Sequence, residues 1–244
     1  MNPFLLLATR AEDAAADSEY EAFLRYAGLT ERELVRIRVE SVSIPPLDPA
    51  DWSGIFVGGS PFTGSIPREH KGDTQLRVEA ELATVLDMVV DVDFPFLGAC
   101  YGVGTLGRHQ GASIDATYAE AITSPTIELT EAGLTDPLLT GVAPAFQAFV
   151  GHKEAVSRLP EHAVLLARSA SCPVQMFRVK THLYATQFHP ELDRVGLMER
   201  VRIYRDAGYY RPGEEIGIRA MADRATVDGA HRILRNFVER YARY

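Results

Sequence analysis

The chain has 244 residues, of which 46% are hydrophobic, and its formal net charge is −8 at pH 7. This length and apolar content suit a globular protein with a large core, and we expect one domain spanning residues 1–244. The acidic balance excludes a general affinity for nucleic acid, because binding of phosphates depends on clustered Lys and Arg. Two cysteines provide neither a disulfide framework nor zinc-site spacing, so we expect a reducing cytoplasmic location and no metal.

A membrane segment is not expected either. The most apolar long stretch, residues 83–104, carries three aspartates that a membrane-spanning helix would not hold at mid-depth. The apolar N-terminus, residues 1–9, has no basic leader and no small-residue cleavage site, so we expect it to be a strand of the mature protein.

Strand-like and helix-like patterns alternate through the first hundred residues. Ser18 and Glu21 have the spacing of a capping box, which favours a helix start at Ser18, and Asp73 can cap a second helix. The expected elements in chain order are a strand at 4–9, a helix from residue 18, strands at 35–39 and 55–57, a helix at 73–90 and a strand at 94–97. This alternation indicates the α/β class.

The pattern changes beyond residue 113. Short strands are expected at 126–130, 146–150, 164–167 and 174–179, separated by turns, which is typical of a small antiparallel meander. Two helices are expected near 195–207 and 227–241. Apolar residues of the second recur at helical spacing, so we expect it to cover the sheet.

Cys100 is the candidate nucleophile. It follows the strand at 94–97, lies between Gly98 and Gly102, and precedes a segment that can begin a helix. Flanking glycines permit the sharp turn that holds a nucleophile in a strained backbone conformation, and a helix N-terminus favours the thiolate. An isolated cysteine after a strand is more often a buried apolar residue, but the glycines favour a nucleophile here. Cys172 lacks such glycines and is expected to be structural.

His189 and Glu191 form the candidate base and its orienting group. They flank Pro190, at which an apolar strand stops, and their spacing lets both side chains point to one side. A cysteine nucleophile needs an imidazole to transfer protons, and that imidazole needs an acceptor on its second nitrogen. A His-x-Glu sequence alone is usually an ordinary surface feature, and seven histidines leave other candidates open.

Taken together, Gly-Ala-Cys-Tyr-Gly at 98–102 and Gln-Phe-His-Pro-Glu at 187–191 strongly resemble the class I glutamine amidotransferases. The resemblance spans about residues 52–193. It implies a flavodoxin-like fold of three layers with a mostly parallel central sheet, and a catalytic triad of Cys100, His189 and Glu191. It also implies hydrolysis of the γ-amide of glutamine through a γ-glutamyl thioester, with release of glutamate and ammonia and no cofactor.

The same resemblance implies the surroundings of the nucleophile. The Gly58-Gly59 loop follows the strand at 55–57, and the backbone N–H groups of Gly59 and Tyr101 would form the oxyanion hole. Donors of this kind stabilise the tetrahedral intermediate by about 3 kcal/mol each. Gly58, Gly104 and His152 would line the substrate pocket. Without the cysteine motif, the Gly-Gly pair would indicate only a tight turn.

Two departures from the family pattern concern the substrate. Gly104 stands where the family usually has a glutamine, and Lys153-Glu154 stand where Gly-Asp is more frequent. Free glutamine and γ-glutamyl peptides therefore both stay open as substrates. The sequence contains no ATP-binding synthetase, so the resemblance implies either a separate ammonia-accepting synthetase or a free hydrolase. A non-catalytic or redox-sensing protein with a reactive cysteine is a third interpretation, and a homodimer is left open.

Overall fold

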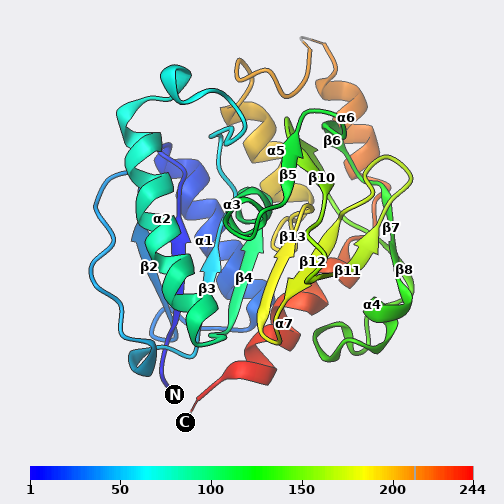
Figure 1. The fold of residues 1–244 in the computed structure, drawn as a ribbon. Helices are drawn as coiled ribbons and strands as arrows, with labels where there is room; N and C mark the ends of the chain where they lie inside the picture. Colours follow the sequence, from blue (N-terminus) through cyan, green and yellow to red (C-terminus); the bar gives the residue numbers. More distant parts are fainter. Residues whose placement is uncertain (212, 244) are drawn as a thin grey trace.

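The computed structural model describes residues 1–211 and 213–243. Nine strands form a central sheet in the order β2-β1-β3-β4-β13-β12-β11-β7-β8 (Figure 1). Its parallel half comprises β2 (Leu34–Arg38), β1 (Phe4–Ala8), β3 (Gly54–Val57), β4 (Phe96–Ala99) and β13 (Leu183–Thr186). Its antiparallel half comprises β12 (Met176–Val179), β11 (Ala163–Arg168), β7 (Thr126–Leu129) and β8 (Ala145–Gln147). The α/β prediction is confirmed, and the meander strands extend the main sheet.

Two small antiparallel ladders stand apart from this sheet. One pairs β5 (Ser113–Asp115) with β10 (Ala155–Arg158), and the other pairs β6 (Glu120–Thr123) with β9 (Val150–His152). Three short 3-10 helices lie in the connections, at Pro49–Asp51, Arg68–His70 and Pro137–Leu139. The strand that ends at His152 matters for the site, because residues 152–155 line the pocket of the candidate nucleophile.

Helices cover both faces of the sheet and complete the three layers (Figure 1). On one face α1 (Asp13–Ala27) contacts both α5 (Arg194–Ile203) and α7 (Asp228–Tyr241). On the other face α2 (Asp73–Asp91) packs against α3 (Tyr101–His109). The short helix α4 (Glu131–Thr135) contacts β11 and β7 of the antiparallel half. The short helix α6 (Glu215–Ala222) contacts β6. Within the described residues, no helix combines the length and apolarity needed to cross a membrane.

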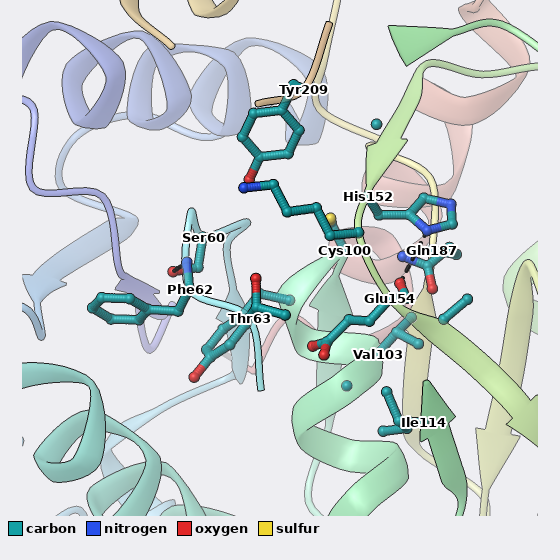
Figure 2. Close-up of a pocket in the computed structure, with 15 residues that line it drawn as sticks. Ser60, Phe62, Thr63, Cys100, Val103, Ile114, His152, Glu154, Gln187 and Tyr209 are labelled. Atoms are coloured by element: carbon teal, nitrogen blue, oxygen red, sulfur yellow. Dashed lines mark hydrogen bonds between the residues drawn. The ribbon is translucent and has the colours of Figure 1, made fainter. Parts of the chain in front are cut away.

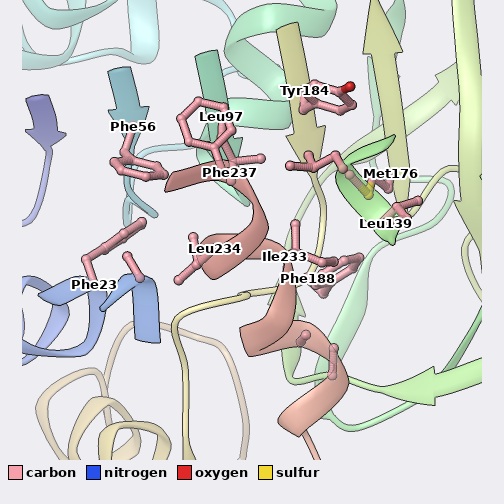
Figure 3. Close-up of a cluster of buried hydrophobic side chains, with 14 of the residues drawn as sticks. Phe23, Phe56, Leu97, Leu139, Met176, Tyr184, Phe188, Ile233, Leu234 and Phe237 are labelled. Atoms are coloured by element: carbon pink, nitrogen blue, oxygen red, sulfur yellow. The ribbon is translucent and has the colours of Figure 1, made fainter. Parts of the chain in front are cut away.

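The core is divided between the two faces of the sheet. Alternate residues of β1 enter different clusters: Phe4 and Leu6 join the α1 and α7 side, and Leu5 and Leu7 join the α2 and α3 side. This follows from the pleat, which points successive side chains in opposite directions. Figure 3 shows the first cluster, in which the ring centroids of Phe56 and Phe237 are 4.9 Å apart. A strand buried on both faces must be apolar throughout, as the N-terminal sequence is.

Several predicted helix ends were wrong. α1 begins at Asp13, not at Ser18, because Ala14, Ala15 and Ala16 favour the helix and two of these alanines are buried. Ser18 therefore lies inside the helix and makes no cap. α2 begins at Asp73 itself, with Gly72 as the N-cap. The helix expected at 195–207 ends at Ile203, and α6 was not predicted.

Candidate active site

Cys100 occupies the turn between β4 and α3 that the sequence predicts. Its backbone has φ 53° and ψ −86°, a region that costs a side-chain-bearing residue about 1–3 kcal/mol. The surrounding glycines make room for it, because a Cβ on Gly98 would lie only 2.7 Å from the Cα of Gly102. The N–H of Cys100 donates to the carbonyl of Thr186 at 2.7 Å. The turn is therefore tied to β13, the strand that leads to His189.

His189 and Glu191 follow the end of β13, which pairs in parallel with β4. Because Thr186 is in register with Ala99, the segments after both strands emerge at the same edge of the sheet. His189 Nδ1 lies 2.8 Å from Glu191 Oε1, and the carboxylate is fully buried. The fold thus brings together all three residues that the sequence selected as a triad.

Electrostatics favour a protonated imidazole at this position. Burial alone would lower the pKa of His189, but the charges of Glu191 and Cys100, and hydrogen bonds to both, raise it to about 9. Burial would likewise raise the pKa of Glu191, but the neighbouring His189 and Arg200 charges hold it well below its usual range. The glutamate is therefore a permanent anion near neutral pH, and His189 carries a proton that it can donate.

A buried ionic network behind His189 was not foreseen from the sequence. Arg200 of α5 donates to Glu191 Oε1 at 2.9 Å and to Glu19 Oε1 of α1 at 3.3 Å, and its Nη1 lies 3.1 Å from His189 Nδ1. Arg10, after β1, donates to the same Glu19 oxygen at 3.0 Å. Two guanidinium groups thus balance two carboxylates beside the imidazole. The four side chains come from four separate segments, so no local pattern marks them.

The sulfur of Cys100 faces a pocket whose walls come from residues 60–63 after the Gly-Gly pair, from α3 and from the 151–155 segment (Figure 2). Gly104 and His152 line this pocket as predicted, whereas Gly58 does not. Gln187 lines this pocket and is 2% exposed, and its carboxamide oxygen makes no hydrogen bond to any described residue. Tyr209 lies on the opposite side of Cys100 from Val103 and Ile114 in Figure 2. A buried polar group without a partner costs about 1–3 kcal/mol, which indicates a position shaped for a ligand.

The two predicted oxyanion donors differ in their surroundings. Tyr101 is the first residue of α3, where backbone N–H groups have no partner within the helix. The N–H of Gly59 instead donates to Glu19 Oε1 at 3.2 Å. Gly59 nevertheless lies against the imidazole, because a Cβ there would come within 2.7 Å of His189 Cε1, and one on Gly58 would strike Glu19. The oxyanion role of Gly59 stays a prediction that requires this N–H to exchange partners.

Gly104 and Glu154 explain how one departure from the family pattern is accommodated. A Cβ on Gly104 would lie 3.3 Å from Glu154 Oε1. The Glu154 carboxylate also accepts hydrogen bonds from the N–H groups of Gly64 and Ser65, at 2.9 and 2.6 Å. The space beside Gly104 is therefore bounded by a carboxylate that ties down the loop after the Gly-Gly pair. A glutamine at position 104 would compete with this arrangement.

His152 lines the pocket, but protein groups occupy both of its ring nitrogens. Nδ1 donates to the carbonyl of Glu154 at 3.0 Å, and Nε2 lies 2.9 Å from Glu120 Oε2. Ser171 and Gln175 also donate to the Glu120 carboxylate. His152 therefore orients the backbone that borders the substrate pocket, and its predicted substrate-binding role stays a prediction.

Cys172 forms a second Cys-His-Glu cluster with His152 and Glu120. The Cys172 sulfur, a ring nitrogen of His152 and a carboxylate oxygen of Glu120 all lie within 4.8 Å of one another. Cys172 is fully buried, and burial raises the pKa of its thiol to about 11. It does not line the pocket that Cys100 faces. A neutral, enclosed thiol is a poor nucleophile, so this cluster does not compete with Cys100 as the candidate triad.

The sequence matches the family described as "Glutamine amidotransferase class-I" over residues 26–195. Among named relatives, it is 27% identical over 153 residues to a subunit of the glutamine-hydrolyzing GMP synthase of Methanobrevibacter smithii, an alignment that covers 62% of this chain and 70% of the relative. It is 33% identical over 113 residues to the corresponding subunit of Methanoculleus marisnigri, covering 46% and 60%. The chain spans only 24% of the length of the GMP synthase of Hamiltonella defensa.

Solved structures extend the similarity along the whole chain. A glutamine amidotransferase from Thermotoga maritima aligns with a TM-score of 0.78 at 17% identity, covering 99% of this chain and 98% of that one. A glutamine amidotransferase from Methylobacillus flagellatus aligns with a TM-score of 0.76, also at 17% identity, covering 100% and 97%. These likenesses establish the fold, and the family match covers more than half of the sequence. The chain belongs to the glutamine amidotransferase class-I family.

Proposed function

We propose that this protein hydrolyses the γ-amide of glutamine with a triad of Cys100, His189 and Glu191. The observation that carries the proposal is the strained Cys100 turn beside a buried His189–Glu191 pair. The family match supports glutamine amidotransferase chemistry in general. The assignment of the three roles is ours.

In the first half-reaction the Cys100 thiolate attacks the γ-carbonyl carbon. The dipole of α3 stabilises the thiolate, and the N–H of Tyr101, joined by that of Gly59, holds the oxyanion. His189 then gives its proton to the departing nitrogen, so ammonia leaves and a γ-glutamyl thioester remains. In the second half-reaction His189 deprotonates water, which hydrolyses the thioester to glutamate. Glu191 keeps Nδ1 of the imidazole oriented throughout.

The ammonia acceptor is a second part of the proposal. Two relatives are named as single subunits of a glutamine-hydrolyzing GMP synthase, and such a name describes one part of an assembly. We therefore propose that a separate synthetase receives the ammonia from this chain. Copurification from the native source, followed by a glutamine-dependent amination assay, tests this step independently of hydrolysis.

The two cysteines provide a matched test of the nucleophile. Cys100→Ala should abolish ammonia release from glutamine, because no other group can form the thioester. Cys172→Ala should retain activity while losing some stability, since it removes a buried sulfur outside the pocket. Ammonia release and mass spectrometry of a trapped acyl-enzyme measure both effects. Undiminished hydrolysis by Cys100→Ala would disprove the assignment. A wild-type protein inert to every amide, with rapid peroxide modification of Cys100, would favour the redox-sensing alternative.

A further inference from the structure

A second cavity adjoins Cys100 on the side of His189. It shares Cys100, Ser60, Gly151 and Tyr209 with the first pocket but is otherwise separate. His189 lines this second cavity and is absent from the first. Four aliphatic side chains make up much of its wall: Ile122, Val150, Leu192 and Leu197.

The position of His189 decides which end of a substrate enters each cavity. A general acid must lie within about 3 Å of the atom that it protonates, so the departing nitrogen has to face His189. Any substituent on that nitrogen then points into the second cavity. The acyl part, with its charged amino and carboxyl groups, is left to the first pocket, where Lys153, Glu154 and the unpartnered Gln187 are located.

The charges of the second cavity are already matched. Arg10 and Arg200 line it, but they pair with Glu19 and Glu191 in the buried network. Arg200 Nε makes no hydrogen bond to a described residue, but this atom is enclosed in the network and not exposed to the cavity. A carboxylate entering this space would have to displace those partners. An uncharged alkyl group would instead contact the four aliphatic side chains and lose no hydrogen bond.

The size of the cavity limits the alkyl group. Its volume is about 50 Å³. A cavity of roughly 150 Å³ holds benzene with its six carbons, so a space one third as large holds about two carbons. Free ammonia would leave most of this space unfilled.

We propose that the second cavity is a leaving-group site for a short, uncharged alkyl amine, so that the protein cleaves N-alkyl γ-glutamyl amides such as N5-ethyl-L-glutamine. This inference rests on the proposed triad. The Cys100 sulfur bonds to the carbonyl carbon of the γ-carboxamide, the bond from that carbon to nitrogen breaks, and the proton of His189 passes to nitrogen, releasing ethylamine. Water then gives its hydroxyl to the carbonyl carbon and a proton to His189, restoring the thiolate and yielding glutamate.

A matched set of substrates tests the proposal on the wild-type protein. L-glutamine, N5-ethyl-L-glutamine, N5-butyl-L-glutamine and γ-glutamylglycine are compared by kcat/KM, with amine release followed by mass spectrometry. We expect the ethyl amide to be cleaved within about tenfold of glutamine. The butyl amide should be at least about a hundredfold slower than the ethyl amide, because each methylene that does not fit costs about 10- to 200-fold. γ-Glutamylglycine, which replaces the methyl by a carboxylate, should also be at least about a hundredfold slower.

A pair of isoleucine variants locates the effect. Ile122 lines the second cavity and Ile114 the first, and both are partly buried. Ile122→Ala should raise the ratio of butyl to ethyl amide cleavage by about tenfold or more. Ile114→Ala should leave this ratio unchanged.

Three results would overturn the inference. Cleavage of glutamine without cleavage of either alkyl amide would reject the leaving-group site and leave the proposed glutaminase intact. Faster cleavage of γ-glutamylglycine than of the ethyl amide would show that the cavity recognises a carboxylate. Failure to cleave any of the four compounds would reject the proposed hydrolysis as well.

Discussion

Two of the charged neighbours of His189, Glu191 and Arg200, act on its proton in opposite directions. Glu191 Oε1 lies 2.8 Å from Nδ1, and its negative charge favours the imidazolium. Arg200 Nη1 lies 3.1 Å from the same nitrogen, and its positive charge opposes protonation. We predict that Glu191→Gln lowers the pKa of His189 and that Arg200→Met raises it.

The size of the effect follows from the wild-type value. The pKa of His189 is raised from 6.5 to about 9, which corresponds to about 3 kcal/mol in favour of the charged form. In Glu191→Gln the imidazole stays buried but loses its anionic partner. Burial disfavours the charged form and of the two raising partners only Cys100 remains, so the pKa of His189 should fall well below about 9.

The assay is the pH dependence of kcat/KM for glutamine. Because the mechanism requires a protonated His189, activity of the wild type should decline as pH rises through about 9. The midpoint of this decline should move to lower pH in Glu191→Gln and to higher pH in Arg200→Met. Equal midpoints in the three proteins, or shifts in one direction for both variants, would refute this reasoning.

Folding stability provides the control for these variants. A raised pKa contributes stability that is complete below pH 6.5 and is lost as pH rises through about 9. The free energy of unfolding of the wild type, compared with His189→Gln, should therefore fall by about 3 kcal/mol across this range in denaturant titrations. Arg200→Met should lose about 3–5 kcal/mol, because two buried carboxylates lose a partner. The kinetics of Arg200→Met are therefore measured only at pH values and temperatures at which circular dichroism shows that this variant is folded.

Three further substitutions test the supporting structure. Gly98→Ala should reduce kcat about a hundredfold and destabilise the fold by about 1–3 kcal/mol, because its Cβ would displace the backbone at Gly102. Steady-state kinetics measure the first effect, and denaturant titrations measure the second. Phe237→Ala should lower the free energy of unfolding by about 3–5 kcal/mol in urea titrations, with kcat preserved while it is folded. Glu120→Gln should raise KM for glutamine more than it lowers kcat, because it frees His152 from its carboxylate partner.

Local sequence was sufficient for the features that depend on short segments. The strands of the parallel half, and the turn built from Gly98, Cys100 and Gly102, were predicted because their requirements lie within a few residues, although β4 lies two residues later than the predicted 94–97. Helix ends were less accurate. Ser18 has a good capping pattern, yet the alanines before it continue the helix and two of them are buried against the core. Packing outweighed the local signal there.

The surroundings of the site required the tertiary structure. A glutamate in α1 and an arginine in α5 would ordinarily be interpreted as solvent-exposed helix residues. They become a buried ionic network because α1 packs on α5 and places Glu19 beside Arg200. The flanking glycines already singled out Cys100 in the sequence, but that Cys172 also lies beside a His-Glu pair, enclosed and outside the Cys100 pocket, was visible only in the fold. Burial and charge balance arise from contacts between distant segments, so they could not be obtained from residue types and spacing alone.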